Sequence, residues 1–589
     1  MKKKIKTWNL DDIFKQEEFE VRLEKVKTEI DKIDEWVKKL EPKMSKDEFK
    51  KLMEFGENLG EEFSRLAYLP GLMEAADQKN KRAKIMKSKV DLVAIELSRK
   101  MRVIGFWLKG IEQKGVKKLD DKRAKELFAV IPDLEYNLNY SREAAKYNLK
   151  IREEEIVDNK DLNGVGVLTD LREMIEMDLE YKVEGKIIKT QAELTKLFYS
   201  KKAKVREGAY KSMFMTHKKE IDKFFAIYQA VVRDWDYEAK IRGYKSPISM
   251  RNFGNQISDE VIENLLAAVK EKRGVFQRFF EYKAKTMNTK RLKRFDLYAP
   301  KPGGVKEKEY KYEEAVKIVL EVFGEFNIKW REAAEKILKE EHVDVWPRIN
   351  KTNGAFCATV SPKISPYVLL NHTGSLRDVY TLAHELGHGI HSLLANKHYP
   401  SIQSANLPLA ETASTLGETI LFEKILSKEK DKEKRKSMLW NKMADSYATI
   451  LRQNYFVLFE IEAHEMISRG SNEKELADLW LKNLKHQFGK SVEVDKVFGY
   501  EWSYISHIVN SPFYCYAYNF GELLALSIYM EYKEKGNEVA KKVNRILAAG
   551  GSEDPIKLLK KEGFEVDKKE FWEKGFEVIR KWQEALEKE

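Results

Sequence analysis

The sequence has little of several features that would place it in a particular class of protein. It has only two cysteines among 589 residues, so a disulfide framework cannot support its fold. Its 13 prolines and 30 glycines are few helix breakers for this length, which favours a mostly helical chain. No apolar run approaches the roughly 18 residues of a membrane span, and no apolar segment of a signal peptide follows the basic start, MKKKIKTWNLDDIF. We therefore expect a folded, cytoplasmic protein without a membrane partner.

The chain also lacks a strong excess of charge of either sign. Its net charge of +12 is the small difference between 108 basic and 96 acidic residues. The two signs are interleaved, as in KKLEPKMSKDEFKK, which is typical of solvated helix faces. We expect no nucleic-acid partner, because a basic stripe or patch is the usual mark of one. The oligomeric state stays open.

Regularly spaced apolar residues predict helices along most of the chain. In EEFEVRLEKVKTEIDKIDEWVKKL they recur at three- and four-residue steps, the pattern of one helical stripe. Proline indicates helix stops at YLPGL and VIPDL, and YKVEGKIIKT indicates a short hairpin. Because 589 residues are too many for one ordinary core, we expect an N-terminal helical lobe over residues 1–200 and a second domain over residues 201–589.

One segment departs from the helical pattern. Between Val343 and Asn371, β-branched and aromatic residues are punctuated by glycine and proline. This composition predicts short strands at about Gly354–Val360 and Tyr367–Leu370. The edge of such a sheet is suited to holding an extended peptide by main-chain hydrogen bonds.

The next segment, TLAHELGHGIHSLLA, indicates a helix with an unusual polar face. Ser375, followed three residues later by Asp378, resembles a capping box, so the helix is expected to begin there and to run through about Asn396. One face of it is an apolar stripe that includes Leu382 and Leu386. The opposite face carries histidines, where a core helix would usually carry lysine and glutamate.

The spacing of these histidines predicts a metal site. His384 and His388 are four residues apart, so one helix can direct both imidazoles to a single zinc ion. Glu385, directly after the first histidine, is placed to act on the open coordination position without binding the metal. A similar start, HEMIS at residues 464–468, has serine in place of the second histidine and is not a site.

Glu411 is the favoured third ligand. His391 and Leu394 occupy the positions that a metzincin reserves for glycine and the third histidine, so that class is excluded. The segment NLPLAETASTLGETILFEK indicates a second helix, capped near Asn406, with Glu411 and Glu418 on one face. Glu411 would complete a His₂Glu zinc site, and Glu418 would orient a ligand histidine. His391 and His398 remain the competing ligands.

The ordered motifs resemble a known family. NHTGSLRDVYTLAHELGHGIHSLLA, followed by LAETASTLGE, resembles the M3 family of zinc peptidases in its oligoendopeptidase F branch. TWNLDDIF, RGYKS, DLYAP, NGAFCA and SHIVNSPFYCYAYNFGELLAL match that branch in the expected order. The resemblance implies a mainly α, two-lobed metallopeptidase with a deep central cleft and a small β-sheet next to the HExxH helix.

The same resemblance implies a function and a set of residues. The enzyme would cleave internal bonds of short peptides with one Zn²⁺ per chain, held by His384, His388 and Glu411, and Glu385 would act as general base. His507, Tyr514 and Tyr518 look like the family's late histidine and tyrosines, which contact the substrate and the transition state. From the residues alone, Tyr514 and Tyr518 share one helical face, whereas Tyr516 points away.

Two other functions stay open at this point. A zinc carboxypeptidase of similar helical fold would need a cationic group for the terminal carboxylate, and many Arg and Lys residues are available. A basic helical scaffold with a structural metal would instead bind nucleic acid in a salt-dependent manner and hydrolyse nothing.

Overall fold

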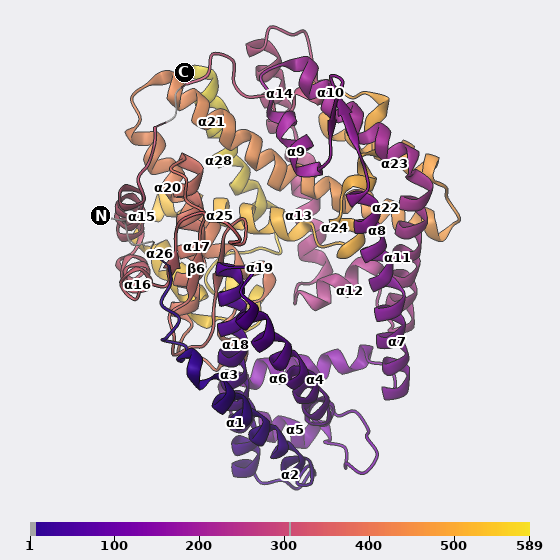
Figure 1. Cartoon of the computed structure of the whole chain (residues 1–589), viewed down its shortest axis with the longest axis vertical. Helices are drawn as coiled ribbons and strands as arrows, with labels where there is room; N and C mark the ends of the chain where they lie inside the picture. Colours follow the sequence, from indigo (N-terminus) through magenta and orange to yellow (C-terminus); the bar gives the residue numbers. More distant parts are fainter. Residues whose placement is uncertain (1–6, 306–307) are drawn as a thin grey trace. The chain divides into compact units, whose positions relative to one another are not determined.

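The computed structural model describes residues 7–305 and 308–589. The basic start of the chain, residues 1–6, lies outside this range. The described residues are predominantly helical, and their strands form three small sheets (Figure 1). The expected mainly α class is therefore confirmed.

The chain divides into two compact units that are interleaved along the sequence. The first comprises Met1–Lys146, Glu307–Lys424 and Glu531–Gly563, and the second comprises Tyr147–Lys306, Ile425–Met530 and Phe564–Glu589. Because compact units need not coincide with functional domains, this division does not test the expected lobe over residues 1–200 and catalytic domain over residues 201–589. Where the catalytic domain begins as a functional unit stays a prediction.

The first unit begins with helices packed around a shared apolar core. Leu23 of α1, Leu52 of α3 and Trp107 of α4 are among its buried side chains. Pro70 does not stop α3, which continues to Ala76 because Leu69, Pro70 and Leu72 are buried in the core and offset the lost backbone hydrogen bond. The helices of this part are α1 (Phe19–Asp31), α2 (Ile33–Val37), α3 (Lys46–Ala76), α4 (Lys81–Lys109), α5 (Asp121–Phe128) and α6 (Pro132–Ala144).

A three-stranded sheet lies beside the helix that carries the histidines. Its strands are β4 (Val343–Asp344), β5 (Phe356–Ala358) and β6 (Tyr367–Leu369), in the order β4-β6-β5, with β5 antiparallel to β6. Both predicted strands are confirmed, although they are shorter than expected. Helix α17 (Leu376–Leu394) packs against β5 and β6, and β5 is left at the edge of the sheet.

The remaining helices of the first unit surround α17 and the sheet. Helices α15, α16 and α26 pack on α17. The set consists of α15 (Tyr312–Phe326), α16 (Ile328–Lys339), α18 (Pro400–Gln403), α19 (Leu407–Ala410), α26 (Asn537–Ala549), α27 (Pro555–Lys561) and most of α20 (Thr412–Lys428).

The second unit is built from helices and two small ribbons. The predicted hairpin is confirmed as β1 (Tyr181–Val183) and β2 (Lys186–Ile188), which pair antiparallel, and β3 (Leu292–Lys293) pairs parallel to β7 (Val492–Glu493). The helices are α7 (Ile151–Asn163), α8 (Val165–Met177), α9 (Gln191–Lys196), α10 (Ala203–Lys219), α11 (Ile221–Ile241), α12 (Pro247–Gly254), α13 (Asp259–Lys272), α14 (Gly274–Thr286), α21 (Lys432–Ser446), α22 (Gln453–Ser468), α23 (Glu473–Phe488), α24 (His507–Asn510), α28 (Lys569–Lys588) and most of α25 (Tyr516–Lys535).

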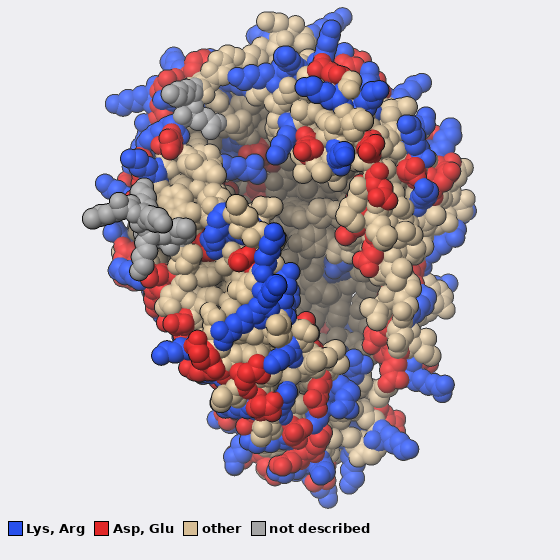
Figure 2. Space-filling model, in the orientation of Figure 1, with Lys and Arg blue, Asp and Glu red and all other residues tan. Residues whose placement is uncertain are grey.

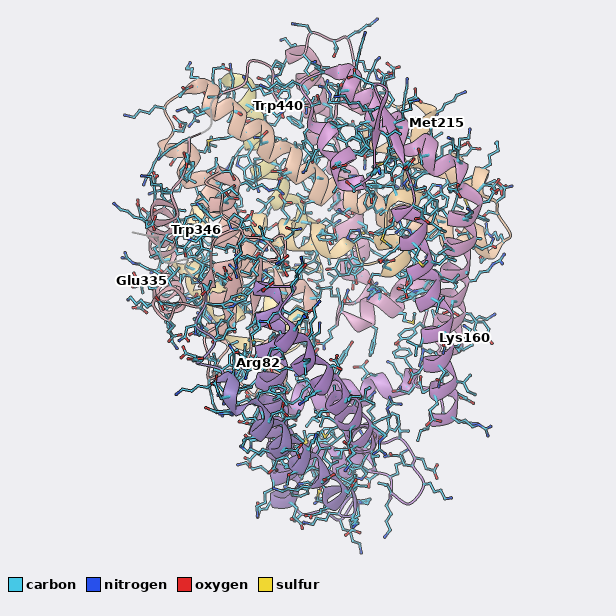
Figure 3. All side chains as sticks on the ribbon, viewed as in Figure 1. Arg82, Lys160, Met215, Glu335, Trp346 and Trp440 are labelled. Carbon is cyan, nitrogen blue, oxygen red and sulfur yellow. The ribbon has the colours of Figure 1, made fainter. Side chains whose placement is uncertain are left out.

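The surface carries charges of both signs side by side. Figure 2 shows Lys and Arg lying among Asp and Glu on one face of the molecule. On α16, Glu335 (Figure 3) accepts hydrogen bonds from Arg331 and Lys339, one turn away on either side. Such exposed pairs contribute little stability, and they account for the interleaved charge runs of the sequence. No helix of the described residues combines the length and apolar character needed to cross a membrane.

Candidate metal centre and active site

Helix α17 holds its histidines in place through its cap and its buried face. The Ser375 hydroxyl accepts a hydrogen bond from the Asp378 N–H, and the Asp378 carboxylate accepts one from the Ser375 N–H, so the predicted capping box is confirmed. Leu382, Leu386 and Ile390 are fully buried on the opposite face. These buried side chains fix the rotation of α17 about its axis, and the opposite face therefore directs His384 and His388 into a cavity.

The segment after α17 differs from the single helix that we expected. A short helix, α19, ends at Ala410, and α20 begins at Thr412, so Glu411 lies at a break between them. Its backbone, with φ −89° and ψ 0°, has left the α-helical region. The break places the Glu411 carboxylate next to the two histidines of α17.

His384, His388 and Glu411 bring three ligand atoms into one small triangle. The Nε2 atoms of His384 and His388 are 3.2 Å apart, and Glu411 Oε2 lies 3.4 Å from the first and 3.5 Å from the second. Tetrahedral bonds of about 2.0–2.2 Å to zinc would separate ligand atoms by about 3.3–3.6 Å. The spacing therefore fits a zinc ion. Within the described part of the chain, this is the one such group of His, Cys, Asp or Glu atoms.

Glu418 influences both which ring nitrogen of His384 carries a proton and the pKa of that imidazole. Its Oε1 lies 2.5 Å from Nδ1 of His384, as expected for an outer partner of a ligand. A proton held on Nδ1 leaves the lone pair of Nε2 free to bind a metal. Although burial alone would lower the pKa of His384, the hydrogen bond and charge of Glu418, with the charges of Glu411 and Glu385, raise it to about 9, so a metal that binds Nε2 near neutral pH displaces a proton from it.

Glu385 lies in the same cavity but is not one of the three clustered ligands. Its side chain is buried, and burial raises its pKa to about 7, an effect that the His384 charge opposes and the Glu411 and Glu418 charges reinforce. A carboxyl with a pKa near neutrality can both accept and return a proton. Three carboxylates around two histidines also make this a favourable position for a dication.

Neither competing histidine joins the three converging candidate ligands, His384, His388 and Glu411, which we call the metal cluster. His398 bonds Asp133 through Nδ1 and the Ala548 carbonyl through Nε2, each at 2.8 Å, so both its nitrogens are engaged elsewhere. His391 is buried one turn beyond His388, and burial lowers its pKa to about 4. Neither belongs to the group of converging ligand atoms.

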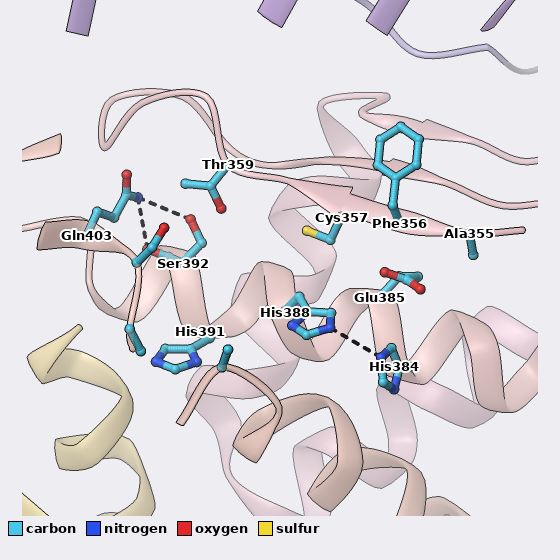
Figure 4. Close-up of a pocket in the computed structure, with 13 residues that line it drawn as sticks. Ala355, Phe356, Cys357, Thr359, His384, Glu385, His388, His391, Ser392 and Gln403 are labelled. Atoms are coloured by element: carbon cyan, nitrogen blue, oxygen red, sulfur yellow. Dashed lines mark hydrogen bonds between the residues drawn. The ribbon is translucent and has the colours of Figure 1, made fainter. Parts of the chain in front are cut away.

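The two histidines of the metal cluster, with Glu385, line a cavity of about 350 Å³. Figure 4 shows the α17 residues His384, Glu385 and His388 on one side of it and Phe356 and Cys357 of β5 on the other. The presence of Cys357 here could not be read from the sequence. Burial, together with the nearby Glu385 charge, raises the pKa of its thiol well above the usual value. The thiol therefore stays protonated, which makes it a poor nucleophile.

Gly387 is a site residue that the sequence pattern did not reveal. A Cβ atom on Gly387 would lie 2.5 Å from Cα of Ser414 and 2.8 Å from its backbone nitrogen. Only glycine therefore allows α17 and the first turn of α20 to approach this closely. Since Glu411 directly precedes that turn, Gly387 sets the distance between the histidines and the third candidate ligand.

We expect Gly387→Ala to weaken metal binding. Its methyl group would push the backbone of α20 away, at an overpacking cost of about 1–3 kcal/mol in the free energy of unfolding. Gly389→Ala is the matched control, because its Cβ would clash only with the flexible end of Ile337, at 2.5 Å, and would make an ordinary contact with Cys357 Sγ at 3.8 Å. Metal titration should separate the two variants, and equal affinity in both would contradict this role for Gly387.

The predicted late histidine and tyrosines meet one another in the second unit. His507 Nε2 lies 3.1 Å from the Tyr518 hydroxyl, and the rings of Tyr514 and Tyr518 are 5.4 Å apart, edge to face. Tyr514 precedes α25 rather than sharing a helical face with Tyr518 as expected, because the chain turns at Phe513, whose φ is 59°. Tyr516 does point away, and its buried hydroxyl accepts a hydrogen bond from Asn255.

Comparison with known proteins identifies the family of the chain. The profile of peptidase family M3 matches residues 196–578. The oligoendopeptidase F homolog of Borreliella burgdorferi is 30% identical over 449 residues, 75% of each chain. The oligoendopeptidase F homolog of Lactococcus lactis is 27% identical over 441 residues, 74% of this chain and 70% of its own.

Two solved structures share the fold. A peptidase from Chlamydophila abortus superposes with a TM-score of 0.87 at 21% identity, covering 98% of this chain and 97% of its own. Oligoendopeptidase-F from Enterococcus faecium gives a TM-score of 0.69 at 20% identity over 97% and 98% of the two chains. Since the family profile spans more than half of the sequence, the chain belongs to peptidase family M3 and is a metalloendopeptidase of the oligoendopeptidase F branch.

Proposed function

We propose that this metalloendopeptidase uses zinc and a glutamate general base to hydrolyse internal bonds of short peptides. The observation that carries the proposal is the triangle of His384 Nε2, His388 Nε2 and Glu411 Oε2, with sides of 3.2–3.5 Å. Two imidazoles and one carboxylate are the ligand set of hydrolytic zinc sites that keep a fourth position open.

The metal and Glu385 would have separate tasks. Zinc in this site would supply Lewis acidity, which makes water a nucleophile near neutral pH. Glu385 accepts the proton of the attacking water and returns it to the leaving amine. Burial, which raises the pKa of this carboxyl in the metal-free site, strengthens it as a base toward the proton of the water. A covalent intermediate is unnecessary, and the protonated thiol of Cys357 provides no nucleophile for one.

The edge strand β5 would align the substrate. Phe356–Ala358 pairs with β6 on one side only, and Phe356 and Cys357 line the same cavity as His384 and Glu385. An extended peptide can add to such an edge through main-chain hydrogen bonds, which require no particular side chains. This arrangement would suit short, unfolded peptides of varied sequence.

His507, Tyr514 and Tyr518 would stabilise the oxyanion of the transition state. The resemblance of their segment to the family supports this role, and the contacts among the three side chains support their acting together. A phenol that donates only when negative charge develops on the carbonyl oxygen lowers the barrier without tightening substrate binding.

Cleavage of peptides with blocked ends tests the proposed function. Zinc-loaded protein should cut an N-acetylated, C-amidated peptide of about ten residues internally, as read by mass spectrometry of the products. A carboxypeptidase would not cut the blocked peptide but would trim an unblocked one. Salt-dependent binding to nucleic acid, without hydrolysis of either peptide, would instead support the nucleic-acid-binding scaffold with a structural metal.

Removing the tyrosine hydroxyls should lower kcat with little change in metal content. We expect Tyr514→Phe or Tyr518→Phe to lose about 10²-fold in kcat where the hydroxyl donates to the oxyanion. Tyr516→Phe is the control. It should keep kcat but lose about 1–3 kcal/mol in the free energy of unfolding, because Asn255 loses a buried partner. If both other variants keep full kcat, these tyrosines serve only packing.

A further inference from the structure

A second cavity adjoins the candidate active site within the first unit. It measures about 440 Å³ and lies between helices α3 and α4 and the loop that follows β5. Thr359, Gln403 and Ser404 line both this cavity and the one around the metal cluster. The two cavities therefore share a wall. A peptide substrate that lay along β5 and extended past Ala358 would pass from the cavity at the metal cluster into the second cavity.

The walls of the second cavity are mainly apolar. Helix α3 contributes Leu52, Met53 and Phe55, and helix α4 contributes Met101, Ile104 and Leu108. A cavity of this composition favours an apolar side chain, because burying one there removes apolar surface from water on both partners.

The one carboxylate in the cavity wall is already engaged. Both oxygens of Glu57 accept hydrogen bonds from Ser401, one from its backbone N–H at 3.1 Å and one from its hydroxyl at 2.6 Å. Glu57 is thus a fixed part of the wall rather than a free anchor for a basic side chain. The chemistry favours an aliphatic or aromatic ligand group.

Two glycines keep the α3 side of the cavity open. Gly56 and Gly60 lie in the middle of a 31-residue helix, four residues apart, and both line the cavity. A Cβ on Gly60 would meet nothing within 4 Å, so packing does not demand glycine there. Alanine would stabilise the helix by about 1 kcal/mol. Gly60 therefore keeps space open in the cavity at the cost of helix stability. This is expected where a ligand side chain enters the cavity.

We propose that this cavity is a substrate subsite for an apolar side chain on the amino-terminal side of the cleaved bond. The proposal rests on the peptidase function above and on the direction of β5. Antiparallel pairing is slightly more stable than parallel pairing, and a peptide paired antiparallel to β5 runs its amino-terminal residues toward Thr359 and Val360, which line the cavity. One apolar residue upstream of the bond would then be selected.

Blocked, internally quenched peptides that share one cleavage site test the proposal. They carry Ala, Leu, Phe, Glu or Lys in turn at each of the four positions before the bond. In the zinc-loaded protein, one of these positions should favour Phe or Leu over Ala by about 10-fold or more in kcat/KM. In Gly60→Phe, whose ring fills the open space, that ratio should fall to about 2-fold or less.

Matched variants keep the result interpretable. Asn58→Phe adds the same ring at an exposed position of α3 outside the cavity and should keep the wild-type ratio. Met53→Ala widens the cavity and should raise the preference for Phe over Leu. An unchanged ratio in both cavity variants, a preference for Lys, or equal cleavage of all five side chains at each of the four positions overturns the subsite. Failure of the wild type to cut any of the peptides would instead refute the peptidase mechanism.

Discussion

Replacing Glu385 by glutamine is expected to lower kcat by about 10²–10⁴-fold while the protein keeps its metal. The amide preserves the size of the side chain but cannot accept the proton of the attacking water. Because Glu385 does not belong to the converging ligand atoms, metal affinity should change little. Steady-state kinetics on a blocked peptide, with metal content measured on the same sample, check both parts of this result.

The chain offers its own control for this substitution. Glu465 follows His464 in α22, so the HE dipeptide occurs there without a second histidine. Glu465 is exposed and pairs with Arg469 on the surface, and His464 bonds Asp236. Glu465→Gln should therefore leave kcat unchanged. Near-normal turnover in the metal-replete Glu385 variant would show that another group is the base.

The parts of the site that the sequence could predict depend on short-range patterns. Ser375 and Asp378 cap a helix from three residues apart, and the apolar stripe of α17 lies within a few turns. The separation of His384 and His388 is fixed by the pitch of that one helix. Each of these relations is local, so reading the residues in order is enough to find them.

The missed features depend on segments that are distant along the chain. The tight contact of Gly387 with Ser414 exists only when α17 and α20 pack together, so nothing near Gly387 in the sequence announces it. Cys357 enters the cavity because β5 lies across from α17. Pro70 is tolerated within α3 because tertiary packing outweighs its local preference. Interleaving of the two units has the same origin, since long-range contacts decide which segments associate.

Metal affinity should differ in a graded order among substitutions of three residues in the first unit. Glu411→Ala removes one of three clustered ligand atoms, so its loss should exceed that of any other variant in the series. Glu418→Ala leaves the ligands in place but frees Nδ1 of His384, and losing such an outer partner costs about 10–100-fold in affinity. His391→Ala should bind metal as the wild type does, although it leaves a cavity in the core. Competition with a chelator of known zinc affinity measures all three variants, and thermal unfolding shows that each is folded. If instead His391→Ala lost the metal and Glu411→Ala kept it, the third ligand would lie on α17, and the break between α19 and α20 would have no part in binding.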